Sequence, residues 1–486
     1  MGTSSNKSQK DKQPAQDQIK EPDIKADPQA QQKQPNNNNQ QEQKTQPNDK
    51  QNQSNNNQEQ LPSTPSLQTS SQSTRKFPFN PNQSVFQANQ TERLVTSYNT
   101  SGNCITIGFG GSLQVFDSFF QSLYTDHNLD GEPLYNYSKF FSESSNGFET
   151  VYTPRGFAYD IPSEQMDILQ SSVLSSSYRS QSISFRDQTD DEKDGFIKAF
   201  FDEEKAKEIN EQLRMEVEKC DKLHQLHFIS DLFNGSAMGL LTSFLYEIQN
   251  DFKSTLKIAH LKYNDSFAHR AFSKRKNYIF SVSKLYNKCT MINLLNAPRA
   301  GEVINNLTLG DRINEYSSRY SMNKIISGIL IDPNANFVYS NGTEILKDTI
   351  KESVKFVFVD CKEGKSHISY FTQNSSLCIY KGMNLINESV RRLFERELSM
   401  IVNKKLNSNK GFYSFLEIEK PFEIDFASHI HHSNIFKEMT EEYFLDFLQD
   451  YNLRHFTPRE REMRDETIWE INDVLNYYKE VWKFLK

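Results

Sequence analysis

The chain has 486 residues, a formal net charge of −7 and a hydrophobic fraction of 36%. This acidic balance argues against a nucleic-acid-binding protein, and no stretch approaches the roughly 18 consecutive apolar residues of a membrane-spanning helix. The N-terminus lacks the apolar stretch of a secretion signal, and the five cysteines are scattered without a CxxC pair, so we expect a cytoplasmic protein with reduced thiols.

Residues 1–90 differ in composition from the rest of the chain. They consist almost wholly of Gln, Asn, Ser, Lys, Asp and Pro, with runs such as NNNNQQEQ. Such a segment cannot bury enough apolar surface to offset the entropy that the chain loses on folding. We therefore predict a long disordered N-terminus and a folded part that begins near residue 91.

The folded part opens with a strand, a glycine-rich turn and a helix. The run 104–109 (CITIGF) predicts the strand, the letters GGS follow it, and residues 115–123 carry apolar side chains on one helical face. This order is typical of an α/β nucleotide-binding fold. Residues 149–160 then predict two short extended segments that are interrupted at Pro154.

A second unit of this kind occupies residues 218–252. Residues 224–232 predict a strand, Asn234, Gly235 and Ser236 form a loop, and residues 240–248 predict an amphipathic helix. A small-residue loop before a helix can hold phosphate because free N–H groups and the helix dipole point at the ligand. A purely structural turn is the alternative, and the pattern alone leaves both open.

The remaining elements follow in order. A charged helix is predicted at 203–220 and a strand at 256–261, and we expect the basic run 269–276 to be a solvated face. Residues 354–380 alternate as strands, and helices are predicted at 386–406, 440–451 and 467–484, the last with Trp469 buried. His429, His431 and His432 are expected in a polar loop, and we predict no metal site.

These elements predict an α/β protein with three folded parts. Residues 91–312 form a nucleotide-binding-like domain with a parallel sheet. Residues 313–385 form a smaller mixed α/β domain, and residues 386–486 form a C-terminal helical layer.

The motifs resemble those of tubulins, and they occur in the tubulin order over residues 104–451. Residues 105–114 (ITIGFGGSLQ) resemble the first tubulin strand and loop, and residues 126–130 (DHNLD) resemble its D-E-H-G-I-D run. Residues 152–156 (YTPRG) are similar to Y-V-P-R-A, and residues 218–227 (EKCDKLHQLH) to E-S-C-D-C-L-Q-G-F-Q. The resemblance implies a highly divergent member of the tubulin/FtsZ superfamily, with a tubulin-like fold.

The resemblance also shows where the GTP site departs from the family. The phosphate loop G-G-G-T-G-S-G stands here as residues 231–237 (DLFNGSA), in which only Gly235 and Ser236 survive. Asp231 would place a carboxylate beside phosphates, and at about 4 Å and an effective dielectric of about 20 the repulsion is about 4 kcal/mol per charge. This replacement predicts very weak nucleotide binding.

The residues at the family's guanine and magnesium contacts also differ from the family pattern. The guanine-reading Asn positions fall on Val282 and Ile304, and the stacking Tyr falls on Ala300. The magnesium loop lacks its Glu, and residues 309–311 (LGD) are the nearest remnant of the catalytic loop. The resemblance leaves these remnants of a GTP pocket: Gly110, Gln114, Asn234, Gly235, Ser236 and Asn305.

We therefore expect a structural or interaction protein of microtubule-based, cytoskeletal structures, a pseudo-GTPase that needs no cofactor. The expected partners are tubulin or tubulin-like proteins, in a homo- or hetero-oligomer. Two alternatives stay open: a working GTP- and magnesium-binding tubulin that polymerises, and a tubulin fold repurposed in an unrelated assembly, including a mitochondrial one.

Overall fold

The structure is a computed structural model that describes residues 102–134, 136–145, 150–179, 182–186, 195–263, 271–313, 320–330, 332–346, 375–382, 425–432, 435–449 and 456–485, the backbone of 413–418, and the isolated residues 349, 353, 392, 393 and 396. All of them belong to the unit Lys76–Lys486. The predicted tail 1–90 lies outside the described residues, and so does nearly all of the predicted helix 386–406.

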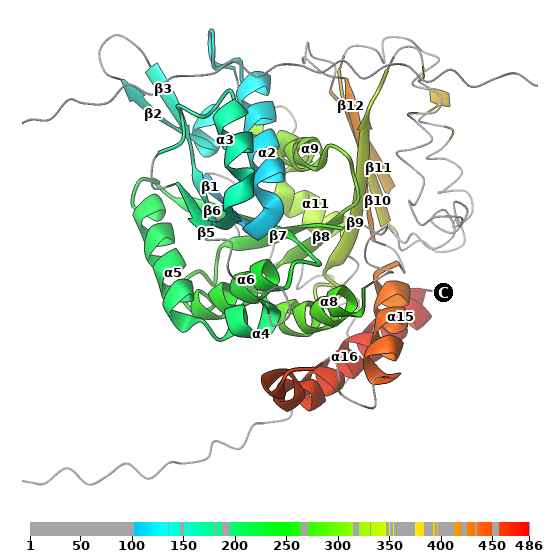
Figure 1. The fold of residues 1–486 in the computed structure, drawn as a ribbon. Helices are drawn as coiled ribbons and strands as arrows, with labels where there is room; N and C mark the ends of the chain where they lie inside the picture. Colours follow the sequence, from blue (N-terminus) through cyan, green and yellow to red (C-terminus); the bar gives the residue numbers. More distant parts are fainter. Residues whose placement is uncertain are drawn as a thin grey trace, which may run out of the picture. The chain divides into compact units, whose positions relative to one another are not determined.

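A ten-stranded sheet forms the centre of the described part, with the order β11-β10-β12-β9-β8-β7-β6-β1-β4-β5 (Figure 1). The strands are β1 (Asn103–Phe109), β4 (Gly156–Pro162), β5 (Ile183–Arg186), β6 (Leu223–Asp231), β7 (Leu256–Lys262), β8 (Met291–Leu295), β9 (Phe337–Glu344), β10 (Ser375–Lys381), β11 (Tyr413–Ile418) and β12 (Phe426–His432). A separate antiparallel hairpin pairs β2 (Phe141–Ser145) with β3 (Thr150–Pro154).

Parallel pairing dominates this sheet. Every pair from β5 to β9 is parallel, and so is the pair β10–β11, whereas β12 is antiparallel to both β9 and β10. The predicted α/β fold with a parallel sheet is confirmed. Because β8 pairs with β9, the strands beyond residue 313 continue the first sheet, and the domain boundaries near residues 312 and 385 stay a prediction.

Helices cover both faces of the sheet (Figure 1). One face packs against α4 (Gly195–Phe200), α5 (Glu203–Val217), α6 (Gly235–Glu247), α8 (Phe272–Leu285), α15 (Ile435–Gln449) and α16 (Pro458–Leu485). The other packs against α2 (Leu113–Asp126), α3 (Met166–Ser171), α9 (Ala300–Arg312) and α11 (Met322–Ile329). Within the described part, no helix is both long enough and apolar enough to cross a bilayer.

Helix α16 begins with a capping box and closes one face of the fold. The Glu460 carboxylate accepts a hydrogen bond from the Thr457 amide at 2.8 Å, and the Thr457 hydroxyl accepts one from the Glu460 amide at 3.3 Å. Pro458 occupies the first helical position, where a missing N–H costs nothing. The Nζ atom of Lys276 on α8 lies 2.8 Å from the same Glu460 carboxylate. The C-terminal helices are thus confirmed, and α16 is anchored to this chain.

Three local predictions were wrong for tertiary reasons. Trp469 is 61% exposed because it points away from α8. The basic run 269–276 is not wholly a solvated face, because α16 covers Lys276. His429 and its neighbours lie in buried strand β12, not in a polar loop, because β9 and β10 flank that strand on both sides.

Candidate functional site

Ligands of open α/β sheets bind at the carboxyl ends of the parallel strands. At this edge β1 leads into α2, and β6 leads into α6, as the two predicted strand–loop–helix units require. The chain turns after β1 at Gly110, whose φ of +58° lies in the left-handed region that favours glycine. Helix α9 begins at the same edge after β8, and a cavity lies between α2 and α9.

The β6–α6 loop is hydrogen-bonded to its own side chains. The Oδ1 atom of Asp231 accepts a hydrogen bond from the Phe233 amide at 2.9 Å. The Oδ1 atom of Asn234 accepts one from the Ala237 amide at 3.2 Å and one from the Ser236 hydroxyl at 3.0 Å. Asn234 is therefore the N-cap of α6. The Phe233 and Ala237 amides are therefore engaged within the chain, whereas the Gly235 amide at the first helical position has no hydrogen bond to the described residues.

The first turn of α6 is also in close contact with neighbouring segments. A Cβ atom at Gly110 would lie 2.5 Å from the Cβ atom of Ala237. A Cβ atom at Gly195, the first residue of α4, would lie 3.0 Å from the backbone nitrogen of Ser236. Protein atoms from the β1–α2 turn and from α4 therefore occupy the space beside this turn.

Asp231 brings an acidic group to the same loop. Burial raises the pKa of its carboxyl above its usual range, while the hydrogen bond from the Phe233 amide and the charge of Lys262 act in the opposite direction. Burial here opposes the ionised form. The carboxyl serves its own loop as a hydrogen-bond acceptor and stands where the family has glycine.

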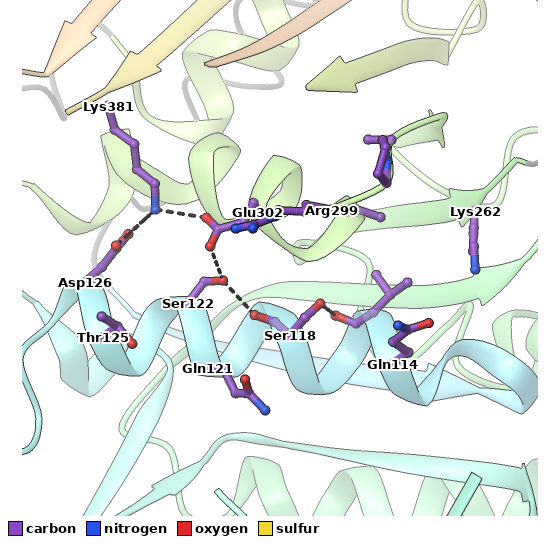
Figure 2. Close-up of a pocket in the computed structure, with 14 residues that line it drawn as sticks. Gln114, Ser118, Gln121, Ser122, Thr125, Asp126, Lys262, Arg299, Glu302 and Lys381 are labelled. Atoms are coloured by element: carbon purple, nitrogen blue, oxygen red, sulfur yellow. Dashed lines mark hydrogen bonds and ion pairs between the residues drawn. The ribbon is translucent and has the colours of Figure 1, made fainter. Parts of the chain in front are cut away.

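A cavity of about 340 Å³ lies between α2 and α9 (Figure 2). Helix α2 lines it with polar side chains that recur at helical spacing: Gln114, Ser118, Gln121, Ser122 and Thr125. Charged side chains from α2, β7, β10 and the start of α9 complete the polar lining: Asp126, Lys262, Lys381, Arg299 and Glu302. Its volume is in the range of small-molecule sites.

Helices α2 and α9 touch beside this cavity. A Cβ atom at Gly301 would lie 2.2 Å from the Oγ atom of Ser118, so only glycine permits this approach. The Ser122 hydroxyl donates a hydrogen bond of 2.7 Å to the Glu302 carboxylate. The contact lies between the two ends of the cavity that Figure 2 shows, one near Lys381 and the other near Lys262.

The end near Lys381 is a buried ion cluster, formed by Asp126, Glu302, Asn305, Arg312 and Lys381. The Nζ atom of Lys381 lies 3.0 Å from Asp126 Oδ1 and 3.0 Å from Glu302 Oε2. Arg312 lies 3.3 Å from Asp126 Oδ2, to which Asn305 donates at 2.8 Å. Burial opposes ionisation of Asp126, but the charges of Lys381 and Arg312 hold its pKa below its usual range. These charges satisfy one another, as buried charges must.

The end near Lys262 carries less compensated positive charge. Lys262 ends β7, and its ammonium group has no hydrogen bond or ion pair with the residues that the structure describes. Arg299 pairs with Glu344 at 2.8 Å, and its side chain does not cap α9, whose N-terminal residues line the cavity. A helix N-terminus adds partial positive charge. This end of the cavity, which we call the cationic end, favours anions.

The six predicted pocket residues fall into three groups. Four of them surround the first turn of α6: Gly110, Asn234, Gly235 and Ser236. Gln114 lines the cavity from the first turn of α2. Asn305 is buried in the ion cluster, where its amide bonds to Asp126 and Arg312. Contact of any of them with a nucleotide stays a prediction.

The structure also shows where the positions lie that align with the family's base-reading and catalytic residues. Val282 and Ile304 are buried and apolar, and Ala300 lines the cavity. Asp311, in the nearest remnant of the catalytic loop, is buried and accepts hydrogen bonds from Gln225 at 2.8 Å and from the Met322 amide at 3.2 Å. Its carboxyl, whose pKa burial raises, serves the interior of the fold.

Sequence reasoning missed Lys262, Arg299, Glu302 and Lys381. Two of them carried a usable signal, because Lys262 and Lys381 each follow a run with the pattern of a strand, LKIAHL and LCIY. A charge at the end of a strand in a parallel sheet lies at the ligand-binding edge. Among the residues that the structure describes, no three His, Cys, Asp or Glu side chains are grouped so that they could hold a metal ion.

The sequence matches a known family profile. The profile described as Tubulin/FtsZ family, GTPase domain, matches residues 103–303, a stretch that runs from β1 into α9 and includes the β6–α6 loop. No curated protein matches the chain.

Proposed function

Since residues 103–303 carry the GTPase domain of the Tubulin/FtsZ family, we propose that this chain is a structural or interaction protein of microtubule-based structures that does not turn over GTP. It binds tubulin or tubulin-like proteins and works in a homo- or hetero-oligomer. Its proposed location is the cytoplasmic cytoskeleton. On this proposal the GTPase-like site is degenerate, and the chain is a pseudo-GTPase.

The closed β6–α6 loop is the observation that carries the proposal. A phosphate loop holds its ligand with free backbone N–H groups at a helix N-terminus. Here the Phe233 and Ala237 amides donate to Asp231 and Asn234, and Gly110 packs against Ala237. This loop offers the triphosphate of GTP fewer free N–H donors than a glycine-rich phosphate loop would, and its own acidic residue, Asp231, stands beside it. We therefore propose no nucleotide cofactor.

Three further observations support the proposal, two that concern the guanine base and one that concerns catalysis. Helix α9 touches α2 at Gly301 and Ser118, which narrows the space between these helices. Val282 and Ile304 have no polar side-chain atoms with which to read guanine. Asp311 is buried and hydrogen-bonded within the fold, so it is not presented to a nucleotide.

The test is to measure bound nucleotide directly. The purified chain is denatured, and the supernatant is chromatographed for GTP and GDP, beside a nucleotide-binding tubulin treated in the same way. We expect no stoichiometric nucleotide from this chain. Isothermal titration with GTP and magnesium should show no micromolar binding, and a submicromolar dissociation constant would overturn the proposal.

The two alternative functions give different outcomes. Stoichiometric GTP or GDP, together with GTP-dependent assembly, would identify a working, polymerising tubulin. Absence of nucleotide, together with failure to bind purified tubulin, would favour a tubulin fold repurposed in another assembly, including a mitochondrial one. Binding to purified tubulin without nucleotide is the result that supports the proposed function.

A further inference from the structure

We propose that the cationic end of the cavity between α2 and α9 binds a small hydroxylated phosphate ester that carries no nucleobase. The inference rests on the proposed function, because it takes the β6–α6 loop to be closed to the phosphates of a nucleotide. The ligand lies beside Lys262, Arg299 and the N-terminus of α9, on the polar face of α2 (Figure 2).

Charge selects an anion at this end. Three basic and two acidic side chains line the cavity: Lys262, Arg299, Lys381, Asp126 and Glu302. Both carboxylates lie within 3.0 Å of the Lys381 ammonium group, so they are neutralised inside the ion cluster. Lys262 makes no hydrogen bond or ion pair with the described residues, although its charge acts on the Asp231 carboxyl at longer range, and it lies at the far end of the cavity from Lys381. An anionic group there gains a charge-assisted hydrogen bond without displacing an existing one.

The start of α9 favours phosphate as that anion. Its N-cap residue, Arg299, makes no side-chain capping bond, and residues 297–300 line the cavity. Uncapped N–H groups at the start of a 13-residue helix suit the several oxygens of a phosphate. The Arg299 guanidinium, which already pairs with Glu344, also lines the cavity and keeps further N–H donors. Two cationic side chains and a helix N-terminus therefore line the cavity from which the anion would be bound.

The polar face of α2 suits hydroxyl groups on the rest of the ligand. Gln114 lines the cavity on the side of Lys262, and its side chain makes no hydrogen bonds to the described residues; Thr125 lies at the other end, beside Asp126 (Figure 2). An amide can donate and accept, so it matches the hydroxyls of a sugar or other polyol. Only Val115, Ala297, Pro298 and Ala300 contribute apolar side chains to the lining, so a wholly apolar ligand is disfavoured.

The same lining disfavours a nucleobase. None of the lining side chains is aromatic, so a base would find no ring on which to stack. The contact between Gly301 and Ser118 also holds α9 against α2. A cavity of about 340 Å³ accommodates a sugar phosphate, because it lies near the lower limit of known small-molecule sites.

The test uses ribose 5-phosphate as the probe, measured by isothermal titration against the full chain. Three variants are compared with the parent protein: Lys262→Gln, which removes the charge; Lys262→Arg, which keeps it; and Lys324→Gln, a matched loss of charge on an exposed residue of α11. We expect the parent, Lys262→Arg and Lys324→Gln to bind alike. We expect Lys262→Gln to bind about tenfold to a hundredfold more weakly, the usual effect of losing a hydrogen bond to a charged group.

The comparison ligands decide the chemical class. Inorganic phosphate and the carboxylate analogue ribonate should bind more weakly than ribose 5-phosphate, and guanosine 5′-monophosphate should bind no more tightly than it. Absence of ribose 5-phosphate binding by the parent, or equal binding by Lys262→Gln, would overturn the site. Tighter binding of guanosine 5′-monophosphate would overturn the exclusion of the base. The nucleotide-release assay fails or succeeds separately, so the proposed function and this inference can be rejected independently.

Discussion

Acidification should destabilise the fold through a buried pair of histidines, His227 on β6 and His260 on β7. Their rings are nearly parallel, with centroids 5.3 Å apart, and meet edge to edge, with His227 Nδ1 3.0 Å from His260 Nε2. His227 Nε2 lies 2.8 Å from Gln225 Oε1, which can only accept, so Nε2 carries the proton and Nδ1 accepts from His260. Protonation of His227 Nδ1 would place two N–H groups against each other, so the pair requires neutral rings.

The size of the effect follows from the pKa of His227. Burial lowers this pKa to about 3, with a smaller contribution from the neighbouring His224, whereas an unfolded histidine titrates near 6.5. Between these two pKa values the unfolded chain therefore binds a proton at His227 that the native chain does not bind. The stabilisation that arises from this difference in the pKa of His227 is fully present above the unfolded pKa. It is lost as the pH falls toward the folded pKa. At about pH 5 this residue alone should lower the free energy of unfolding by about 2 kcal/mol relative to about pH 8.

Urea unfolding at the two pH values, followed by tryptophan fluorescence, measures this change. His127, His224 and His431 also have pKa values that burial lowers, so the parent should lose more than His227 accounts for. Comparison with His227→Gln removes the titration of this residue; the remaining groups are common to both proteins, and among them His260, whose pKa burial and His227 lower, is the one in contact with the substituted side chain. The variant should lose about 2 kcal/mol less between about pH 8 and about pH 5. Equal losses in the two proteins would refute the reasoning.

Three further substitutions test the packing, each by urea unfolding at neutral pH. Lys276→Met removes the cation 2.8 Å from buried Glu460 and should cost about 3–5 kcal/mol; an unchanged midpoint would contradict a buried pair. Trp469→Ala should change stability by less than about 0.5 kcal/mol, whereas Trp482→Ala, at 8% exposure, should cost about 3–5 kcal/mol; equal effects would contradict the placement of α16. Gly301→Val should cost about 1–3 kcal/mol through overpacking against α2, and a neutral effect would show that the two helices do not touch.

The sequence predicted the central elements because their signals are local. The runs at 104–109 and 224–232 became β1 and β6 with ends shifted by one residue, and the small-residue loop after β6 became the start of α6. Apolar runs and glycine-rich turns depend on neighbouring residues alone. The ordered tubulin motifs then indicated the family that the match over residues 103–303 supports.

The cavity could not be predicted in the same way because distant segments build it. Lys381 joins it from β10, and neither its charge nor its position in the sequence indicates that Asp126 lies beside it. Trp469 fits an apolar pattern and still faces outward, because α8 lies on the other side of α16. The basic run around Lys276 predicts a solvated side chain, because the sequence does not show that Glu460 faces it. In each case the missing information is the identity of a tertiary neighbour.

The pairing of Asp126 with Lys381 joins residues 255 positions apart and so has a consequence for the order of folding. During synthesis α2 leaves the ribosome long before β10 exists. Until both Arg312 and Lys381 are in place the charges of the cluster are not balanced, and burying a carboxylate without its cations costs several kcal/mol. Contacts of such long sequence separation form slowly. The last turn of α2 should therefore remain open to solvent in folding intermediates, and its amides should be among the last to resist hydrogen exchange.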